Sequence, residues 1–167
     1  MNVMISPAAT AIAFSEAVEA IWLEADLLDR CDYDAWLDMW TPTGFYIVPT
    51  DIKVTSDYGA HLNHAFDDGA MRRMRVDRLV GGHAISSTPA ARTVRTMSRF
   101  RIEEAGADFC VIRSGMHLFE YKFERQRIYA ADVTYRLQRV EGVLKLDEKV
   151  VRFVNAADAL GSLSYLP

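Results

Sequence analysis

The stretch YAADVTYRLQRVEGVLKLDEKVVRF, residues 129–153, decides the fold, because its apolar side chains recur at every second position. One face of its first half carries Tyr129, Ala131, Val133, Tyr135 and Leu137. Such alternation is typical of a β-strand with one buried face. Glu141 and Gly142 indicate a turn, and the next strand ends with the apolar residues Val150, Val151, Phe153 and Val154. That run predicts a strand that is central in a sheet or covered on both faces.

Two further strands are predicted upstream. Between residues 92 and 102 one face carries Val94, Thr96, Ser98, Phe100 and Ile102, and the other carries Thr93, Arg95, Met97, Arg99 and Arg101. We expect the arginine face to lie outside the core, because arginine is rarely fully buried. Residues 111–122 form the next strand, and Gly115 within it predicts a bulge or sharp bend that curls the sheet. Four consecutive antiparallel strands are therefore expected between residues 92 and 154.

The N-terminal part of the chain predicts a long helix. Ser6 and Pro7 suit a helix start, because the serine oxygen accepts from free amides and proline at the first helical position loses no hydrogen bond. An apolar stripe follows at spacings of three and four: Phe14, Ala17, Val18, Ile21, Ala25 and Leu28. The acidic residues Glu16, Glu19, Glu24 and Asp26 fall mostly off this stripe. The stripe is expected to cover an apolar surface.

A second, short helix is predicted after Asp32, which can cap its N-terminus and precedes Trp36. Pro42 ends this helix, because the residue before a proline is pushed out of the helical region. Residues 45–48 predict the first strand. Residues 49–65 have no periodicity and predict a loop that contains a short strand.

A third helix is predicted after Asp67 or Asp68, either of which can cap it. Its expected shared face carries Met71, Met74, Arg75, Arg78 and Leu79. The glycines at 81 and 82 end it, because glycine tolerates the left-handed conformation.

Helices followed by a long sheet indicate an α+β fold in a single domain, residues 1–167. We predict a strongly curved, mixed or antiparallel sheet that forms a cone, with the N-terminal helices packed on its concave face. A composition of 50% hydrophobic residues is sufficient for a continuous core.

Composition excludes several classes of function. The net charge is −4, from 19 basic and 23 acidic residues, so nucleic acid is not an expected partner. The two cysteines, Cys31 and Cys110, form no CxxC pair and suit the reducing cytoplasm. The sequence contains no apolar run long enough to cross a membrane and no signal peptide. Walker, GxSxG and dinucleotide-binding glycine patterns are also absent.

Candidate chemistry is sparse. His61 and His64 are the nearest approach to a metal-ligand pair, and we interpret them as solvated loop residues. An acid/base enzyme working inside the cone would use His117, Asp32 and Tyr46. Each also has a structural interpretation, because a histidine or tyrosine fits a strand and an aspartate fits a helix cap.

Arginines are concentrated in one region of this acidic chain. They are Arg72, Arg73, Arg75, Arg78, Arg92, Arg95, Arg99 and Arg101. Arginine forks suit carboxylates at protein interfaces, whereas the alternative is a solvated basic face.

Five segments together resemble a known family. They are EADLLDRCDYDAWLDMW (24–40), FDDGAMRRMRVDRL (66–79), ARTVRTMSRFRI (91–102), YAADVTYRLQRVEGVLKLDEKVVRF (129–153) and LGSLSYLP (160–167). In order and spacing they are similar to the small (beta) subunit of aromatic-ring-hydroxylating dioxygenases, the Rieske non-haem iron oxygenases. The resemblance implies a SnoaL-like fold of the nuclear-transport-factor (NTF2) type.

The resemblance also implies a role and partners. It implies a non-catalytic subunit that supports a large alpha subunit, typically as α3β3, in aromatic compound catabolism. The Rieske 2Fe-2S cluster and the mononuclear iron are then expected in the alpha subunit, with no cofactor in this chain. We predict an interface that includes Arg72, Arg75, Arg78, Arg95, Arg99, Arg101, Tyr165 and Leu166. Alternatives are a stand-alone SnoaL-like lyase or isomerase, and a binding module that self-associates, for example as a homotrimer.

Overall fold

The computed structural model describes residues 11–81, 90–157 and 165–167. In chain order the elements are helices α1 (Phe14–Asp29) and α2 (Tyr33–Asp38), strand β1 (Trp40–Pro49), the 3-10 turn η1 (Tyr58–Ala60), strand β2 (Asn63–Asp67), helix α3 (Gly69–Val80), and strands β3 (Arg92–Ala105), β4 (Phe109–Lys122), β5 (Arg125–Val140) and β6 (Val143–Phe153). The predicted helix start at Ser6 and Pro7 lies outside the described residues, and α1 begins at Phe14.

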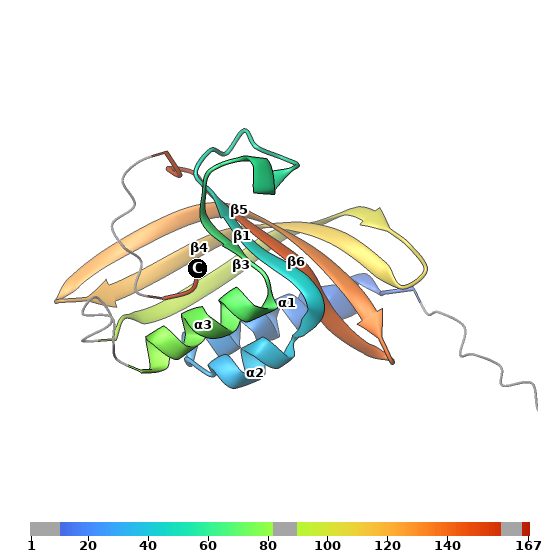
Figure 1. Cartoon of the computed structure of the whole chain (residues 1–167), viewed down its shortest axis with the longest axis horizontal. Coiled ribbons are helices and arrows are strands. Elements are labelled where there is room, and N and C mark those ends of the chain that lie inside the picture. The colour runs from blue at the N-terminus through green and yellow to red at the C-terminus, as the bar shows by residue number, and fades with distance from the viewer. Residues whose placement is uncertain (1–10, 82–89, 158–164) are drawn as a thin grey trace, which may run out of the picture.

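All six strands form one sheet in the order β2-β1-β6-β5-β4-β3. Strand β1 runs parallel to β6, and every other neighbouring pair is antiparallel. Figure 1 shows the sheet curving over the helices, whose buried side chains join one core with those of the strands. The predicted α+β class, with a curved mixed sheet and helices on its inner face, is confirmed, and β6 is central as expected.

The hairpin that decided the fold forms as predicted. Ala131, Val133, Tyr135 and Leu137 of β5 are buried, and Val140 pairs with Val143 across a two-residue turn. Both turn residues have positive φ, 50° at Glu141 and 85° at Gly142. Turns of this kind match the right-handed twist of the two strands they join.

Helix α1 buries the predicted stripe with two exceptions. Phe14, at its first position, is 50% exposed, whereas Glu24, which was expected to lie off the stripe, is fully buried. Glu24 follows Ile21 by three positions and precedes Leu28 by four, so it lies on the same helical face. The spacing therefore indicated its position, but the rarity of buried carboxylates argued against it.

The predicted faces of β3 are reversed over residues 93–98, before the register shift, whereas Arg99 and Arg101 are exposed as predicted. Arg95 and Met97 face the core and are each 7% exposed, whereas Val94 is 59% exposed. The cause lies on α1, where the Asp29 carboxylate pairs with the Arg95 guanidinium and accepts from its main-chain N–H at 2.7 Å. A buried charge is tolerated when it is paired and hydrogen-bonded in this way.

Helix α3 turns a different face to the core than predicted. Arg72 and Val76 are buried, while Met71 and Met74 are 42% and 49% exposed. The Arg72 guanidinium lies 4.1 Å from the Trp40 ring centroid and donates to main-chain carbonyls. Burial lowers the pKa of Arg72 to about 10.

The cap of α3 gives a first test. The Asp68 carboxylate accepts from the Met71 N–H at 2.9 Å, as the sequence predicted. We expect Asp68→Ala to lower the free energy of unfolding by about 1 kcal/mol, because this amide loses its partner. Urea unfolding would measure it, with Asp77→Ala on the same helix as the control. Equal effects of both changes would contradict the capping role.

Candidate functional site

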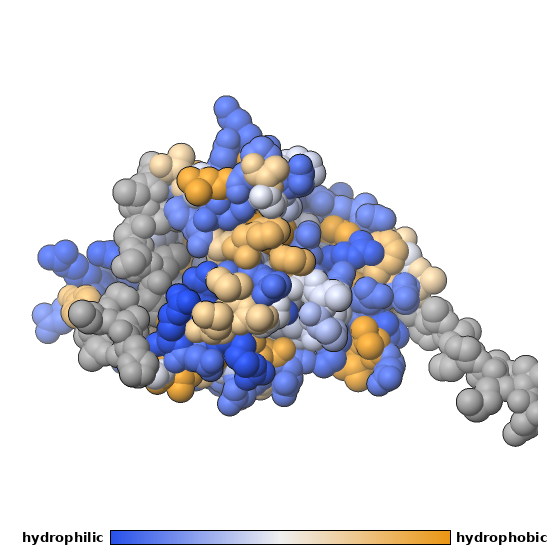
Figure 2. Space-filling view, viewed as in Figure 1, coloured by the Kyte–Doolittle hydropathy of each residue, from blue (hydrophilic) through white to orange (hydrophobic). Residues whose placement is uncertain are grey.

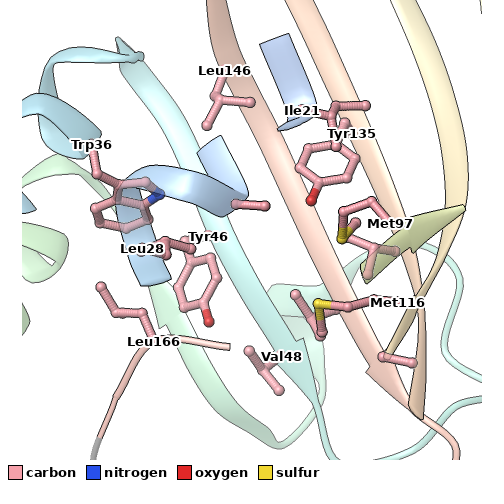
Figure 3. Close-up of a cluster of buried hydrophobic side chains, with 14 of the residues drawn as sticks. Ile21, Leu28, Trp36, Tyr46, Val48, Met97, Met116, Tyr135, Leu146 and Leu166 are labelled. Atoms are coloured by element: carbon pink, nitrogen blue, oxygen red, sulfur yellow. The ribbon is translucent and has the colours of Figure 1, made fainter. Parts of the chain in front are cut away.

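The interior of the cone is filled by aromatic side chains. Trp36, Tyr46 and Tyr135 are at most 1% exposed, and Figure 3 shows them with Leu166 in one cluster. Trp36 meets Tyr46 edge to face with ring centroids 6.1 Å apart, and Trp40 meets Trp36 in the same manner at 5.5 Å. Such pairs each contribute about 1 kcal/mol beyond their burial. The core here is packed side chain against side chain.

A buried ion pair lies within this core. The Lys149 ammonium is 2.8 Å from Glu24 Oε1, and neither side chain is more than 1% exposed. Trp36 Nε1 donates to the same carboxylate oxygen at 2.8 Å, and the Tyr135 hydroxyl donates to the other oxygen at 3.4 Å. Burial lowers the pKa of Lys149, and the adjacent Glu24 carboxylate opposes that shift. Glu24 thus joins α1, α2, β5 and β6 through one carboxylate.

The sequence pattern does not indicate that Glu24 and Lys149 form a pair. Lys149 lies two positions before Val151 and four before Phe153, both on the core face of β6. This period of two was the sequence signal that the Lys149 side chain faces the core. No local feature pairs it with Glu24, which lies 125 positions away.

The three candidate acid/base residues do not converge. Tyr46 is buried in the cone, where its hydroxyl donates to the Pro167 main-chain oxygen at 2.8 Å and burial raises its pKa well above the usual value. His117 is exposed on β4, between the buried Met116 and Leu118, so it faces the outer side of the sheet. Asp32 is exposed and caps α2 by accepting from Ala35 N–H at 3.3 Å. The interpretation of the three as one acid/base site is therefore wrong.

The outer face of the sheet carries a basic pocket. Its volume is about 490 Å³, and its lining includes Arg99, Arg101, Arg113, Gly115 and Asp132. Arg113 forms ion pairs with Glu103 at 2.7 Å and with Asp132 at 3.0 Å. Within the described part of the chain, Arg99 and Arg101 have no ion pair of their own. This pocket therefore presents guanidinium groups that remain available to a carboxylate.

A backbone bulge creates this arrangement. The register between β3 and β4 shifts between Ser98 and Arg101, and Arg99 in the bulge has φ 56°. An added Cβ at Gly115 would lie 2.6 Å from Arg99 Nη2, so the glycine leaves room for the guanidinium. The bulge predicted at Gly115 is thus present, but on the partner strand. Positive φ at a residue other than glycine is uncommon and is often associated with function.

The predicted interface residues divide into two groups. Arg72, Arg95, Tyr165 and Leu166 are buried within the chain, so they do not form an exposed surface, and this part of the prediction is wrong. Inside the fold, the Arg72 guanidinium donates to main-chain carbonyls and the Arg95 guanidinium pairs with the Asp29 carboxylate.

The remaining predicted arginines lie nearer the surface. Arg75 is partly exposed and pairs with Asp67 at 2.5 Å. Arg78 is exposed on α3, in the helical layer, whereas Arg99 and Arg101 are exposed on the opposite side of the sheet. Figure 2, on the face that carries α3, shows hydrophilic side chains around small separate groups of apolar ones.

Other chemistry is limited in the described part of the chain. Within it, no three His, Cys, Asp or Glu side chains gather closely enough to hold a metal ion. Among the described helices none has the length and apolarity to cross a membrane. Both cysteines are free, Cys31 exposed and Cys110 buried. His61 and His64 are exposed, and His64 Nε2 lies 3.2 Å from the Ala156 carbonyl.

The fold places the chain in a known structural class. A curved open sheet over helices is also the architecture of an NTF2-like protein with a cystatin-like fold from Novosphingobium aromaticivorans. The two superpose with a TM-score of 0.60 at 12% identity, covering 87% of this chain and 84% of the other. The predicted NTF2-like fold is confirmed.

Within this class the chain belongs to the ring hydroxylating beta subunit family, whose characteristic sequence matches residues 23–157. It is 32% identical over 136 residues to the small oxygenase component of the p-cumate 2,3-dioxygenase system of Pseudomonas putida, covering 81% of this chain and 76% of that one. It superposes on the benzoate 1,2-dioxygenase beta subunit of Burkholderia mallei with a TM-score of 0.76 at 21% identity, covering 92% and 97% of the two chains. The resemblance stated from the sequence is confirmed.

Proposed function

We propose that this chain is a docking subunit without catalytic activity of its own, which holds the large alpha subunit of an aromatic-ring-hydroxylating dioxygenase. The observation that carries this proposal is the filled cone. In a fold of this type an enzyme needs an enclosed space for substrate, and here Trp36, Tyr46, Tyr135 and Leu166 occupy that space. Family membership supports the beta-subunit role over the lyase or isomerase alternative.

The proposal assigns the redox groups to the partner. We infer that the alpha subunit holds the Rieske cluster and the mononuclear iron, and that the assembly is α3β3. The two free cysteines suit a reducing compartment, so we place the complex in the cytoplasm. The family relatives are named as components of oxygenases, which supports a hetero-oligomer.

The docking surface is proposed to include the basic pocket. Arg99 and Arg101 are exposed, lie beside Arg113 and carry charges that no ion pair among the described residues neutralises. Planar guanidinium groups bind carboxylates through two parallel hydrogen bonds, which gives both energy and orientation. Arg78 lies on α3, on the other side of the sheet from this pocket. It contributes to docking only if the large subunit also contacts the helices.

Co-expression tests the proposal directly. The chain would be produced alone and with a large Rieske subunit from the same source, and each product would be purified by a tag on this chain. We expect the large subunit to co-purify in equal molar amount, with a native mass that fits three copies of each. The chain alone is expected to contain less than about 0.1 iron per chain and to show no turnover of aromatic substrates.

Three outcomes would contradict the proposal. One is failure of the two chains to co-purify. Another is stoichiometric iron bound to the chain alone. The third is turnover by the chain alone, which would restore the lyase or isomerase alternative. Native mass spectrometry of the isolated chain would also show whether it forms a homotrimer by itself.

A further inference from the structure

The residues Tyr165–Pro167 occupy the cone in a manner that resembles a bound ligand. They belong to no strand or helix, yet Leu166 is fully buried and Tyr165 is 9% exposed. Figure 3 shows Leu166 beside Trp36, Leu28 and Tyr46, all members of the main core. No ladder of sheet hydrogen bonds holds this segment, so separate side-chain contacts fix its place.

Three buried donors bind the main chain of this segment. Arg95 Nη2 donates to the Leu166 carbonyl. The Tyr46 hydroxyl donates to the Pro167 main-chain oxygen at 2.8 Å, and Lys149 Nζ donates to the same oxygen at 3.2 Å. These donors come from β3, β1 and β6, so three separate strands converge on the main-chain oxygens of two successive residues.

The charges around the segment are already balanced without it. Lys149 pairs with Glu24, and Arg95 pairs with Asp29. The segment therefore supplies acceptor oxygens and an apolar side chain, which are what a peptide main chain offers. A buried donor left without an acceptor costs about 1–3 kcal/mol, so the site favours an occupant with carbonyl oxygens at these two positions.

We propose that Arg95, Lys149 and Tyr46, with the apolar walls of the cone, form a peptide-binding site whose resident occupant is Tyr165–Pro167. The ligand class is a short peptide with a leucine-sized side chain followed by main-chain oxygens. Peptide supplied from outside then competes with the resident segment for the same contacts. This site is independent of docking to the large subunit, because its donors face the inside of the cone.

The test uses the full chain carrying Leu166→Gly, which removes the apolar anchor and keeps every other residue. Calorimetric titration with the peptide Tyr-Leu-Pro is expected to show one site per chain. The unchanged chain is expected to bind at least about ten-fold more weakly, because its own segment competes. The peptide Tyr-Gly-Pro is the ligand control, and it is expected to bind neither chain at the same concentration.

Two hydroxyl deletions in the Leu166→Gly background locate the site. Tyr46→Phe is expected to weaken binding of Tyr-Leu-Pro about five-fold, because one donor to the peptide is lost. Tyr135→Phe is the matched control, since its hydroxyl contacts Glu24 and not the segment, and it is expected to leave the affinity unchanged. If Leu166→Gly unfolds the chain, refolding with Tyr-Leu-Pro is expected to restore a cooperative thermal transition.

The proposal is overturned by any of three results. Tyr-Leu-Pro could neither bind the variant nor restore its folding. The unchanged chain could bind the peptide as tightly as the variant does. Tyr46→Phe and Tyr135→Phe could change the affinity equally, which would show that the segment is only part of the core.

Discussion

Lys149→Met is expected to lower the free energy of unfolding by about 3–5 kcal/mol, because it leaves the Glu24 carboxylate buried without its cation. Lys149 and Glu24 are both fully buried and 2.8 Å apart. Methionine fills a similar volume, so the loss comes from the unpaired charge and not from a cavity. Urea unfolding followed by tryptophan fluorescence measures the change, and Trp36 reports on the site because its indole contacts Glu24.

Two further variants separate this electrostatic effect from general damage to β6. Lys145→Met, on the same strand but half-buried and bonded to the Asp38 carbonyl, is expected to cost about 1 kcal/mol or less. Glu24→Gln combined with Lys149→Met is expected to recover part of the loss, because no unpaired charge remains. A Lys149→Met cost no larger than that of Lys145→Met would contradict the importance of the buried pair.

Arg99→Glu combined with Arg101→Glu is expected to weaken assembly with the large subunit about 100-fold, while the isolated chain unfolds at an unchanged urea concentration. Both side chains lie at the exposed basic pocket, and neither has an ion pair within the described residues. Reversing both charges replaces attraction to a partner carboxylate by repulsion, and 100-fold in affinity corresponds to about 2.7 kcal/mol. Sedimentation of the purified subunits at several salt concentrations measures the affinity.

A charge-matched control is available. Arg125→Glu combined with Lys53→Glu makes the same change in net charge at two exposed positions, the first residue of β5 and the loop after β1, and is expected to leave assembly intact. Gly115→Ala offers a test without a charge change, because its Cβ displaces the Arg99 guanidinium and should weaken assembly in the same direction. Equal weakening by the control pair would show that net charge, and not the pocket, governs assembly.

Features determined by residues close in sequence were predictable. The period of two in β5 and β6, the turn at Glu141 and Gly142, and the helix caps at Asp32 and Asp68 all appear as predicted. Each depends on a hydrogen bond or a side-chain direction within a few residues, so local sequence is sufficient information. The family was predictable for a similar reason, because its sequence motifs occur in order along most of the chain.

The tertiary structure alone decided which charged side chains are buried. The rarity of buried arginine predicts that Arg95 lies outside the core, yet Asp29, 66 positions away, neutralises it within the fold. Lys149 and Glu24 meet across 125 positions in the same way. The sequence by itself determined the strands, the turns and the family, since these follow from local pattern. Only the folded chain shows which of its basic side chains lie in the core and which line the outer pocket. The physical reason is that a basic side chain is buried only where an element distant in sequence supplies an acidic partner or hydrogen-bond acceptors.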